Sequence, residues 1–227
     1  MTILYGKPYL AALYMRESQK LHSPDAELSK DSQQDFVVLG TALSALYQLG
    51  TCHGHCRGGD HILESLAGRT NNLGSAAFLL TMNGYYDEAL GLIRSIGEIA
   101  NLLLLFAENP AKYGEWVQAT KKARIKNFGP SAVQKLMKDK SLTPMDGTWY
   151  SELCEKAVHV TPDTIPNLHN SAGQKYVGGI EQPEGFRKCV EQLTEISASV
   201  AMISSRMIGR DDLMQRLVDD IKSINDQ

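Results

Sequence analysis

The residues with the clearest chemical potential are an arginine and a glutamate four positions apart in a strongly apolar segment. At 100° per residue, Arg94 and Glu98 share a helical strip about 60° wide with Asp87 and Asn101, while apolar side chains cover most of the remaining circumference. Such a helix is expected at the centre of a fold, where a charge is tolerated only when it is paired and hydrogen-bonded. The strip is therefore either a functional site or a structural feature, namely a thin solvent-facing edge or a buried salt bridge.

Polar residues from other segments are candidates to complete such a site. Arg69 lies near the border of an apolar stripe on the preceding predicted helix and is the expected cross-helix partner of the Arg94 and Glu98 pair. His159 closes a later helix beside a long loop, where it is a candidate acid or base, although the helix dipole alone also favours a histidine there. We therefore take Arg69, Arg94, Glu98 and His159 as candidate catalytic residues. The candidate ligand contacts around them are Asp60, His61, Asn101 and Tyr150.

A short cysteine- and histidine-rich segment resembles a metal site at first sight. Cys52, His53, His55 and Cys56 are four residues that can bind zinc. A structural zinc site, however, usually draws its ligands from two separate chain segments, and no second ligand pair follows. A polar turn at the end of a helix is the alternative, and we predict no metal.

Basic residues are concentrated in one part of the chain. Between residues 112 and 140 there are eight lysines and arginines and only two acidic residues, although the whole chain has a net charge of −3. Lys121, Lys122, Arg124 and Lys126 are interspersed with Tyr113, Trp116 and Phe128. Such a segment can contact phosphates and stack on bases, and the alternative is a solvated basic face. These four basic residues are further candidate ligand contacts.

The composition narrows the class of protein. Hydrophobic residues make up 43% of the 227 residues, enough for one sizeable core. The longest apolar run, Leu102 to Ala107, is far too short for a membrane span, and the first twenty residues are a poor signal peptide. Four cysteines without secretory features indicate reduced thiols and a cytoplasmic location. Glycine-rich phosphate loops and Ser/His/Asp arrangements are absent, so we expect no cofactor and no membrane partner.

Helical periodicity accounts for most of the chain. Apolar residues recur at steps of three and four, and no useful β-alternation occurs. Gly68 and nearby serines are small enough to let a neighbouring helix approach closely. The segment 160–185 holds seven prolines and glycines and is predicted to be a long loop, either a binding loop or lid or a solvated connector. The predicted helices are 32–47, 60–82, 86–108, 110–127, 131–138, 147–159, 186–207 and 211–224. The prediction is one all-α domain over 1–227, an antiparallel bundle of about seven to eight helices.

Joined motifs in the middle of the chain resemble a known family. The stretches 58–64, 68–69, 86–90 and 94–102, followed by Tyr150 to Glu155 and His159, are similar to an all-helical, mainly bacterial family of domains of unknown function. A looser likeness is to HEPN-type helical ribonucleases, whose sites use an arginine and a histidine near a helical dimer interface. That likeness implies RNA cleavage and homodimerisation. Arg57 and His61 are separated by three residues here, fewer than in the HEPN pattern.

Two hypotheses of function follow. In the first, the chain is a binding or regulatory module that recognises a phosphate-bearing ligand, a nucleic acid or a partner protein, in bacterial stress or phage defence. In the alternative, it is a HEPN-like metal-independent ribonuclease in which Arg69 or Arg94 stabilises phosphate charge and His159 transfers protons.

Overall fold

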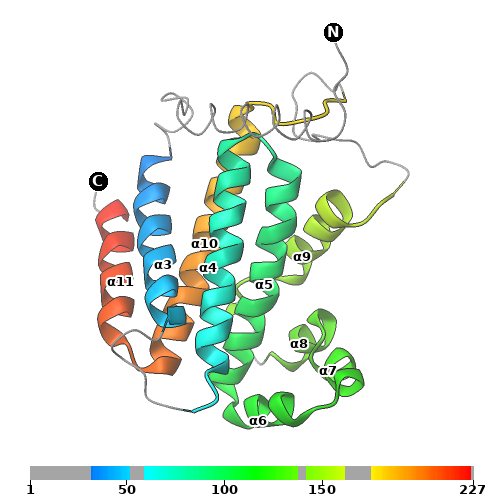
Figure 1. Ribbon diagram of the computed structural model, residues 1–227, viewed down its shortest axis with the longest axis vertical. Helices are drawn as coiled ribbons and strands as arrows, with labels where there is room; N and C mark the ends of the chain where they lie inside the picture. Colours follow the sequence, from blue (N-terminus) through cyan, green and yellow to red (C-terminus); the bar gives the residue numbers. More distant parts are fainter. Residues whose placement is uncertain (1–31, 52–58, 138–141, 162–174, 226–227) are drawn as a thin grey trace, which may run out of the picture.

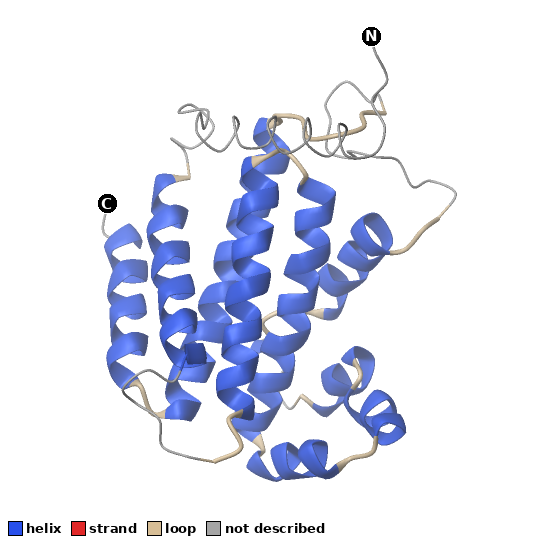
Figure 2. Cartoon of the chain, in the orientation of Figure 1, coloured by secondary structure: helices blue, strands red, loops and turns tan. Residues whose placement is uncertain are grey.

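The predicted all-α fold is confirmed. The computed structural model describes residues 32–51, 59–137, 142–161 and 175–225, and these residues form helices and connecting turns without a strand (Figures 1 and 2). The candidate zinc segment from Cys52 to Cys56 lies outside the described residues, as does the middle of the predicted long loop.

Four long helices form the body of the bundle, and a fifth covers one side of it. The four are α3 (Gln33–Thr51), α4 (Ile62–Met82), α5 (Tyr86–Glu108) and α10 (Pro183–Ile208). The fifth, α11 (Asp211–Asn225), packs on α3 and α10. Figure 1 shows α4 running opposite to α3 and α5, as the short α4–α5 turn requires. The shared core includes the fully buried side chains of Leu39, Leu46, Ile93, Ile96, Phe106, Leu193 and Ile196, each of which contributes about 1.5–3 kcal/mol by leaving water.

The contact between α3 and α4 depends on two glycines. A Cβ atom added to Gly50 would lie 2.5 Å from the Cα atom of Gly68, so the two helices approach at the backbone. The sequence prediction that Gly68 permits a close helix approach is confirmed.

Four short helices cover the opposite side of α5. They are α6 (Pro110–Gln118), α7 (Lys121–Phe128), α8 (Pro130–Leu136) and α9 (Gly147–Leu153), and α9 continues as the π-helical turn η2 (Cys154–Val158). All except α7 pack directly on α5, and α7 packs on α8 (Figure 1). Val133 and Met137 form a small apolar cluster with Leu105 of α5 that is separate from the main core. Helix α5 is therefore central, as its apolar circumference predicted.

Two of the differences between predicted and observed boundaries have a clear local cause. The single helix expected over 110–127 is broken at Ala119, because the Thr120 side chain caps a new helix by accepting a hydrogen bond from the Ala123 N–H at 3.3 Å. The loop expected over 160–185 ends earlier, because Pro183 occupies the first turn of α10, where a proline is tolerated.

Among the described helices, α5 alone is long and apolar enough to cross a membrane. More than half of its most apolar window, 56%, is buried inside the bundle, as in any central helix of a folded domain. Its composition therefore indicates a membrane span only weakly.

Candidate functional site

Arg94 is the centre of a polar cluster between α5 and α9. Its Nη2 atom lies 2.7 Å from Glu98 Oε1 and donates to the Tyr150 hydroxyl at 2.7 Å. Its Nε–H donates to Cys154 Sγ at 3.0 Å, and its guanidinium carbon lies 4.9 Å from the centre of the Tyr150 ring. The Tyr150 hydroxyl in turn donates to Glu98 Oε1 at 3.0 Å. Four side chains therefore form one closed network.

Helical spacing explains how these side chains meet. Arg94 and Glu98 are one turn apart on α5, and Tyr150 and Cys154 are four residues apart where α9 passes into η2. Residues four apart share a helix face, so two such faces oppose each other across the α5–α9 contact. The Arg94 and Glu98 side chains keep only 17% and 34% of their exposure. The predicted pairing and partial burial of these two residues are confirmed.

The electrostatics keep the arginine charged and the tyrosine neutral. Burial alone lowers the pKa of Arg94, but the hydrogen bonds to Cys154 and Tyr150 and the charge of Glu98 outweigh it, and the net shift is upward. Burial and the side-chain hydrogen bond with Cys154 raise the pKa of Tyr150 to about 12, against the lowering effect of Arg94. The neutral phenol therefore remains a donor to the Glu98 carboxylate at ordinary pH.

A pocket of about 180 Å³ adjoins this cluster. It lies between α5, the junction of α7 with α8, and α9. Its polar lining residues are Ser95, Glu98, Asn101 and Tyr150, and its apolar lining residues are Ile99, Leu102, Phe128, Pro130 and Val133. The α5 wall therefore carries both polar and apolar side chains, and the wall from α7 and α8 is apolar.

Asn101 holds the segment that leads into α9. Its Nδ2 donates to the Met145 carbonyl at 2.7 Å, and its Oδ1 accepts from the Met145 N–H at 3.0 Å. Both residues are buried. The amide therefore satisfies two buried backbone groups, and the role that the structure gives to this candidate ligand contact is to hold the segment that precedes α9 and Tyr150.

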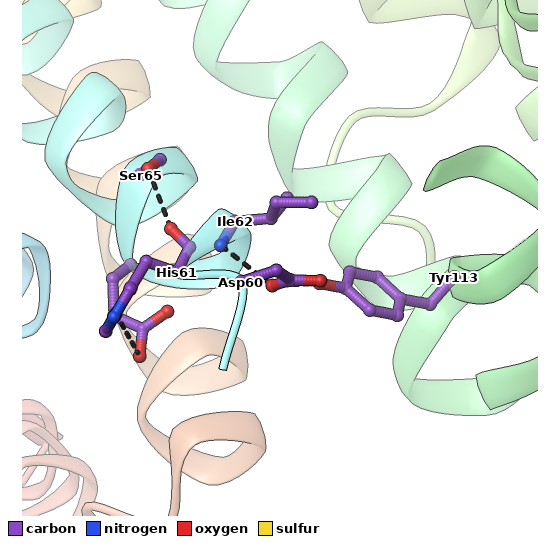
Figure 3. A network of polar contacts seen from close by, with 6 residues as sticks. Asp60, His61, Ile62, Ser65 and Tyr113 are labelled. Atoms are coloured by element: carbon purple, nitrogen blue, oxygen red, sulfur yellow. Dashed lines mark hydrogen bonds and ion pairs between the residues drawn. The ribbon is translucent and has the colours of Figure 1, made fainter. Parts of the chain in front are cut away.

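Asp60 and His61 lie apart from the Arg94 cluster. The Asp60 carboxylate accepts from the Tyr113 hydroxyl at 2.8 Å and from the Ile62 N–H at 3.1 Å, and so ties the start of α4 to α6 (Figure 3). Tyr113 packs on Phe106 of α5. Phe106 is twelve residues after Arg94, so the two positions are about 18 Å apart along the helix. The structure therefore does not bring Asp60 and Arg94 into one site.

The other two candidate catalytic residues are also separate. Arg69 is exposed on α4, and within the described residues no ion pair joins it to Glu98. His159 is exposed after η2, and its backbone N–H donates to the Cys154 carbonyl at 2.8 Å. No hydrogen bond between described residues links the His159 side chain to Arg94. The sequence analysis did not identify Tyr150 and Cys154 as the hydrogen-bond partners of Arg94. Their four-residue spacing, which places them on one face of a helix, was the sequence feature that could have indicated this.

The basic residues of α7 form a second candidate surface. Lys121, Lys122, Arg124 and Lys126 are all exposed. Arg124 is held in place, because its Nε–H donates to the Ala119 carbonyl at 3.0 Å and its guanidinium lies 6.0 Å from the Trp116 ring. Of the aromatic residues expected to stack on bases, Trp116 packs on Phe106 and Tyr113 does the same. Phe128 instead lines the pocket.

Comparison of the chain with protein-family models, with curated proteins and with solved structures finds no match. The function of this protein has to be inferred from the cluster, the pocket and the basic helix themselves.

Proposed function

We propose that this protein is a nucleic-acid-binding module and that the interface is the basic helix α7. The observation that carries the proposal is an uncompensated charge: from Trp116 to Met137 the chain has five basic residues and no acidic residue. Nucleic-acid affinity is dominated by such contacts with phosphate groups.

Ion pairing distinguishes the lysines of α7 from three lysines elsewhere in the protein. Lys112, Lys156 and Lys188 each lie within 3.0 Å of a glutamate carboxylate oxygen. Within the described residues, no carboxylate pairs with Lys121, Lys122 or Lys126. A cation that is already neutralised gains little from a phosphate, whereas these lysines keep their full attraction for one.

The length of α7 and its position beside the pocket also support nucleic-acid binding. Helix α7 has eight residues and is therefore about 12 Å long, and its basic side chains all lie within that length. Its final residue, Phe128, lines the pocket beside Glu98. A bound strand can therefore contact the charged helix and the pocket together.

The test is the salt dependence of binding to a fluorescently labelled single-stranded RNA, followed by anisotropy. Four phosphate contacts predict a slope of log affinity against log salt of about −2.8, or about a 50-fold loss of affinity for a fourfold rise in salt. Lys121→Gln with Lys122→Gln is expected to halve that slope. The matched control is Lys175→Gln with Lys222→Gln, which removes two exposed lysines away from α7.

Binding that does not depend on salt, or equal slopes for the two double variants, contradicts the proposal. The alternative of a metal-independent ribonuclease is read from the same samples on a denaturing gel. RNA cleavage that His159→Ala abolishes in a folded protein favours that alternative.

A further inference from the structure

The pocket beside α7 offers hydrogen-bond acceptors to a ligand and few donors. Both polar ends of the Asn101 amide are bonded to the Met145 backbone. The Tyr150 hydroxyl hydrogen is donated to Glu98, and the Ser95 hydroxyl hydrogen is donated to the Gly91 carbonyl at 3.3 Å. Glu98 and Ser95 therefore present oxygen lone pairs to the pocket.

The Glu98 carboxylate is positioned before any ligand arrives. Oε1 receives hydrogen bonds from Arg94 and Tyr150, at 2.7 and 3.0 Å. No donor in the described part of the chain is bonded to Oε2. An anchored carboxylate with one open oxygen is a preorganised acceptor, which lowers the entropy lost when a ligand binds.

Ser95 and Glu98 stand side by side. They are three residues apart on α5, so their Cβ atoms are about 5–6 Å apart on one helix face. Two acceptors on one face match a ligand edge that carries two neighbouring donors.

The apolar wall limits what can carry those donors. Phe128 and Val133 line the pocket from α7 and α8, Leu102 lines it from α5, and the enclosed volume is about 180 Å³. This is smaller than the roughly 300–1,000 Å³ of sites for drug-sized molecules. One planar ring system fits it, stacked against an aromatic side chain as bases commonly are in single-strand complexes.

We propose that this pocket binds a guanine base of the strand that lies along α7, with Glu98 and Ser95 accepting from its N1–H and N2–H₂ groups. This inference rests on the proposed function for the presence of the strand, and it adds sequence preference to it.

The chemistry of the other bases disfavours them here. Adenine places a ring-nitrogen acceptor beside its amino group, and that nitrogen would face the Glu98 carboxylate. Cytosine likewise places a ring-nitrogen acceptor, N3, beside its amino group. Uracil has a single N3–H between two carbonyl oxygens. Only guanine presents two adjacent donors on its Watson–Crick edge, and a site built for two donors leaves unpaired groups when another base enters.

The experiment compares two RNA heptamers, UUUGUUU and UUUAUUU, by competition anisotropy with the full chain. A two-bond contact to a base predicts about a tenfold preference for the guanine heptamer. Glu98→Gln is expected to abolish the preference, and Ser95→Ala to reduce it severalfold while leaving the Arg94–Glu98–Tyr150 network in place. Glu88→Gln, an exposed glutamate on the same helix, is the matched control and keeps the preference. If Glu98→Gln does not fold, Ser95→Ala decides.

Guanosine, which carries no phosphate, separates this inference from the proposed function. Guanosine is expected to bind more tightly than adenosine, and Lys121→Gln with Lys122→Gln is expected to leave that difference unchanged. Equal affinity for the two heptamers, or an unchanged preference in Ser95→Ala, overturns the pocket assignment even if RNA binding depends on α7. Guanosine selectivity without salt-dependent RNA binding leaves the pocket and removes the role of α7.

Discussion

Replacing Asn101 by alanine is expected to lower the stability of the protein more than its single side-chain amide would suggest. The amide pairs with both the N–H and the carbonyl of Met145, whose side chain is 0% exposed. Alanine leaves two buried backbone groups without partners, and each such group costs about 1–3 kcal/mol. We therefore expect Asn101→Ala to reduce the free energy of unfolding by about 3 kcal/mol.

For a chain of this length, 1 kcal/mol shifts the melting temperature by about 2–4 °C, so the expected fall is about 6–12 °C. Urea unfolding followed by tryptophan fluorescence measures the free energy directly, because Trp149 lies on α9 and packs against the main core. The control is Asn72→Ala, at an exposed position of α4, which is expected to change the stability by less than about 0.5 kcal/mol. If Asn101→Ala is as stable as that control, the Met145 backbone is not held as described and the account of how α9 is positioned is refuted.

Three further outcomes follow from the fold and the cluster. Gly50→Ala is expected to destabilise the protein strongly and Gly68→Ala much less. The reason is that the added Cβ atom lies 2.5 Å from the nearest backbone atom at position 50 and 3.4 Å from it at position 68. Thermal unfolding of both variants tests this order, and a lower melting temperature for Gly68→Ala than for Gly50→Ala would contradict it. Arg94→Lys is expected to cost about 1–3 kcal/mol in urea unfolding, since a lysine cannot keep both the Cys154 and Tyr150 contacts, whereas Arg187→Lys, at an exposed pair with Glu191, should cost less than about 0.5 kcal/mol. The pKa of Tyr86, Tyr113 and Tyr150 is raised to about 12, mainly by burial. The stability that these neutral phenols contribute is therefore complete below pH 10 and falls between about pH 10 and 12. Absorbance at 295 nm should show these three tyrosines ionising last, and their ionisation together with the other tyrosines at an unshifted pKa would contradict the burial.

The helices were largely predictable because a 3.6-residue apolar period is a local property of the sequence. The same property explains the two errors in their bounds. A threonine that caps a new helix at position 120 and a proline in the first turn of α10 at position 183 are start signals, yet each also interrupts an apolar pattern. Where a residue is compatible with both a helix start and a loop, the tertiary contacts decide which of the two forms.

The candidate site was predictable only in part, for a different reason. The positions of Arg94 and Glu98 around the helix axis indicated a buried pair, and the structure has this pair. This inference was possible because it needs the sequence of one helix alone. Their remaining partners come from a helix more than fifty residues later in the chain, and a helical pattern does not state which helices adjoin. Arg69, the cation on the preceding helix, proved to be at an exposed position. Pairwise packing of helices is the information that a single sequence lacks.

The small apolar cluster of Leu105, Val133 and Met137 attaches α7 and α8 to α5. Few buried apolar residues hold α7 and α8, and Leu102 and Phe128 connect this cluster to the main core. We therefore expect these two helices to open locally, so that their backbone amides exchange with deuterium at a lower free-energy cost than those of α10. Such an opening would uncover the part of the pocket that Phe128 lines, and would thereby give a planar ring access to Glu98.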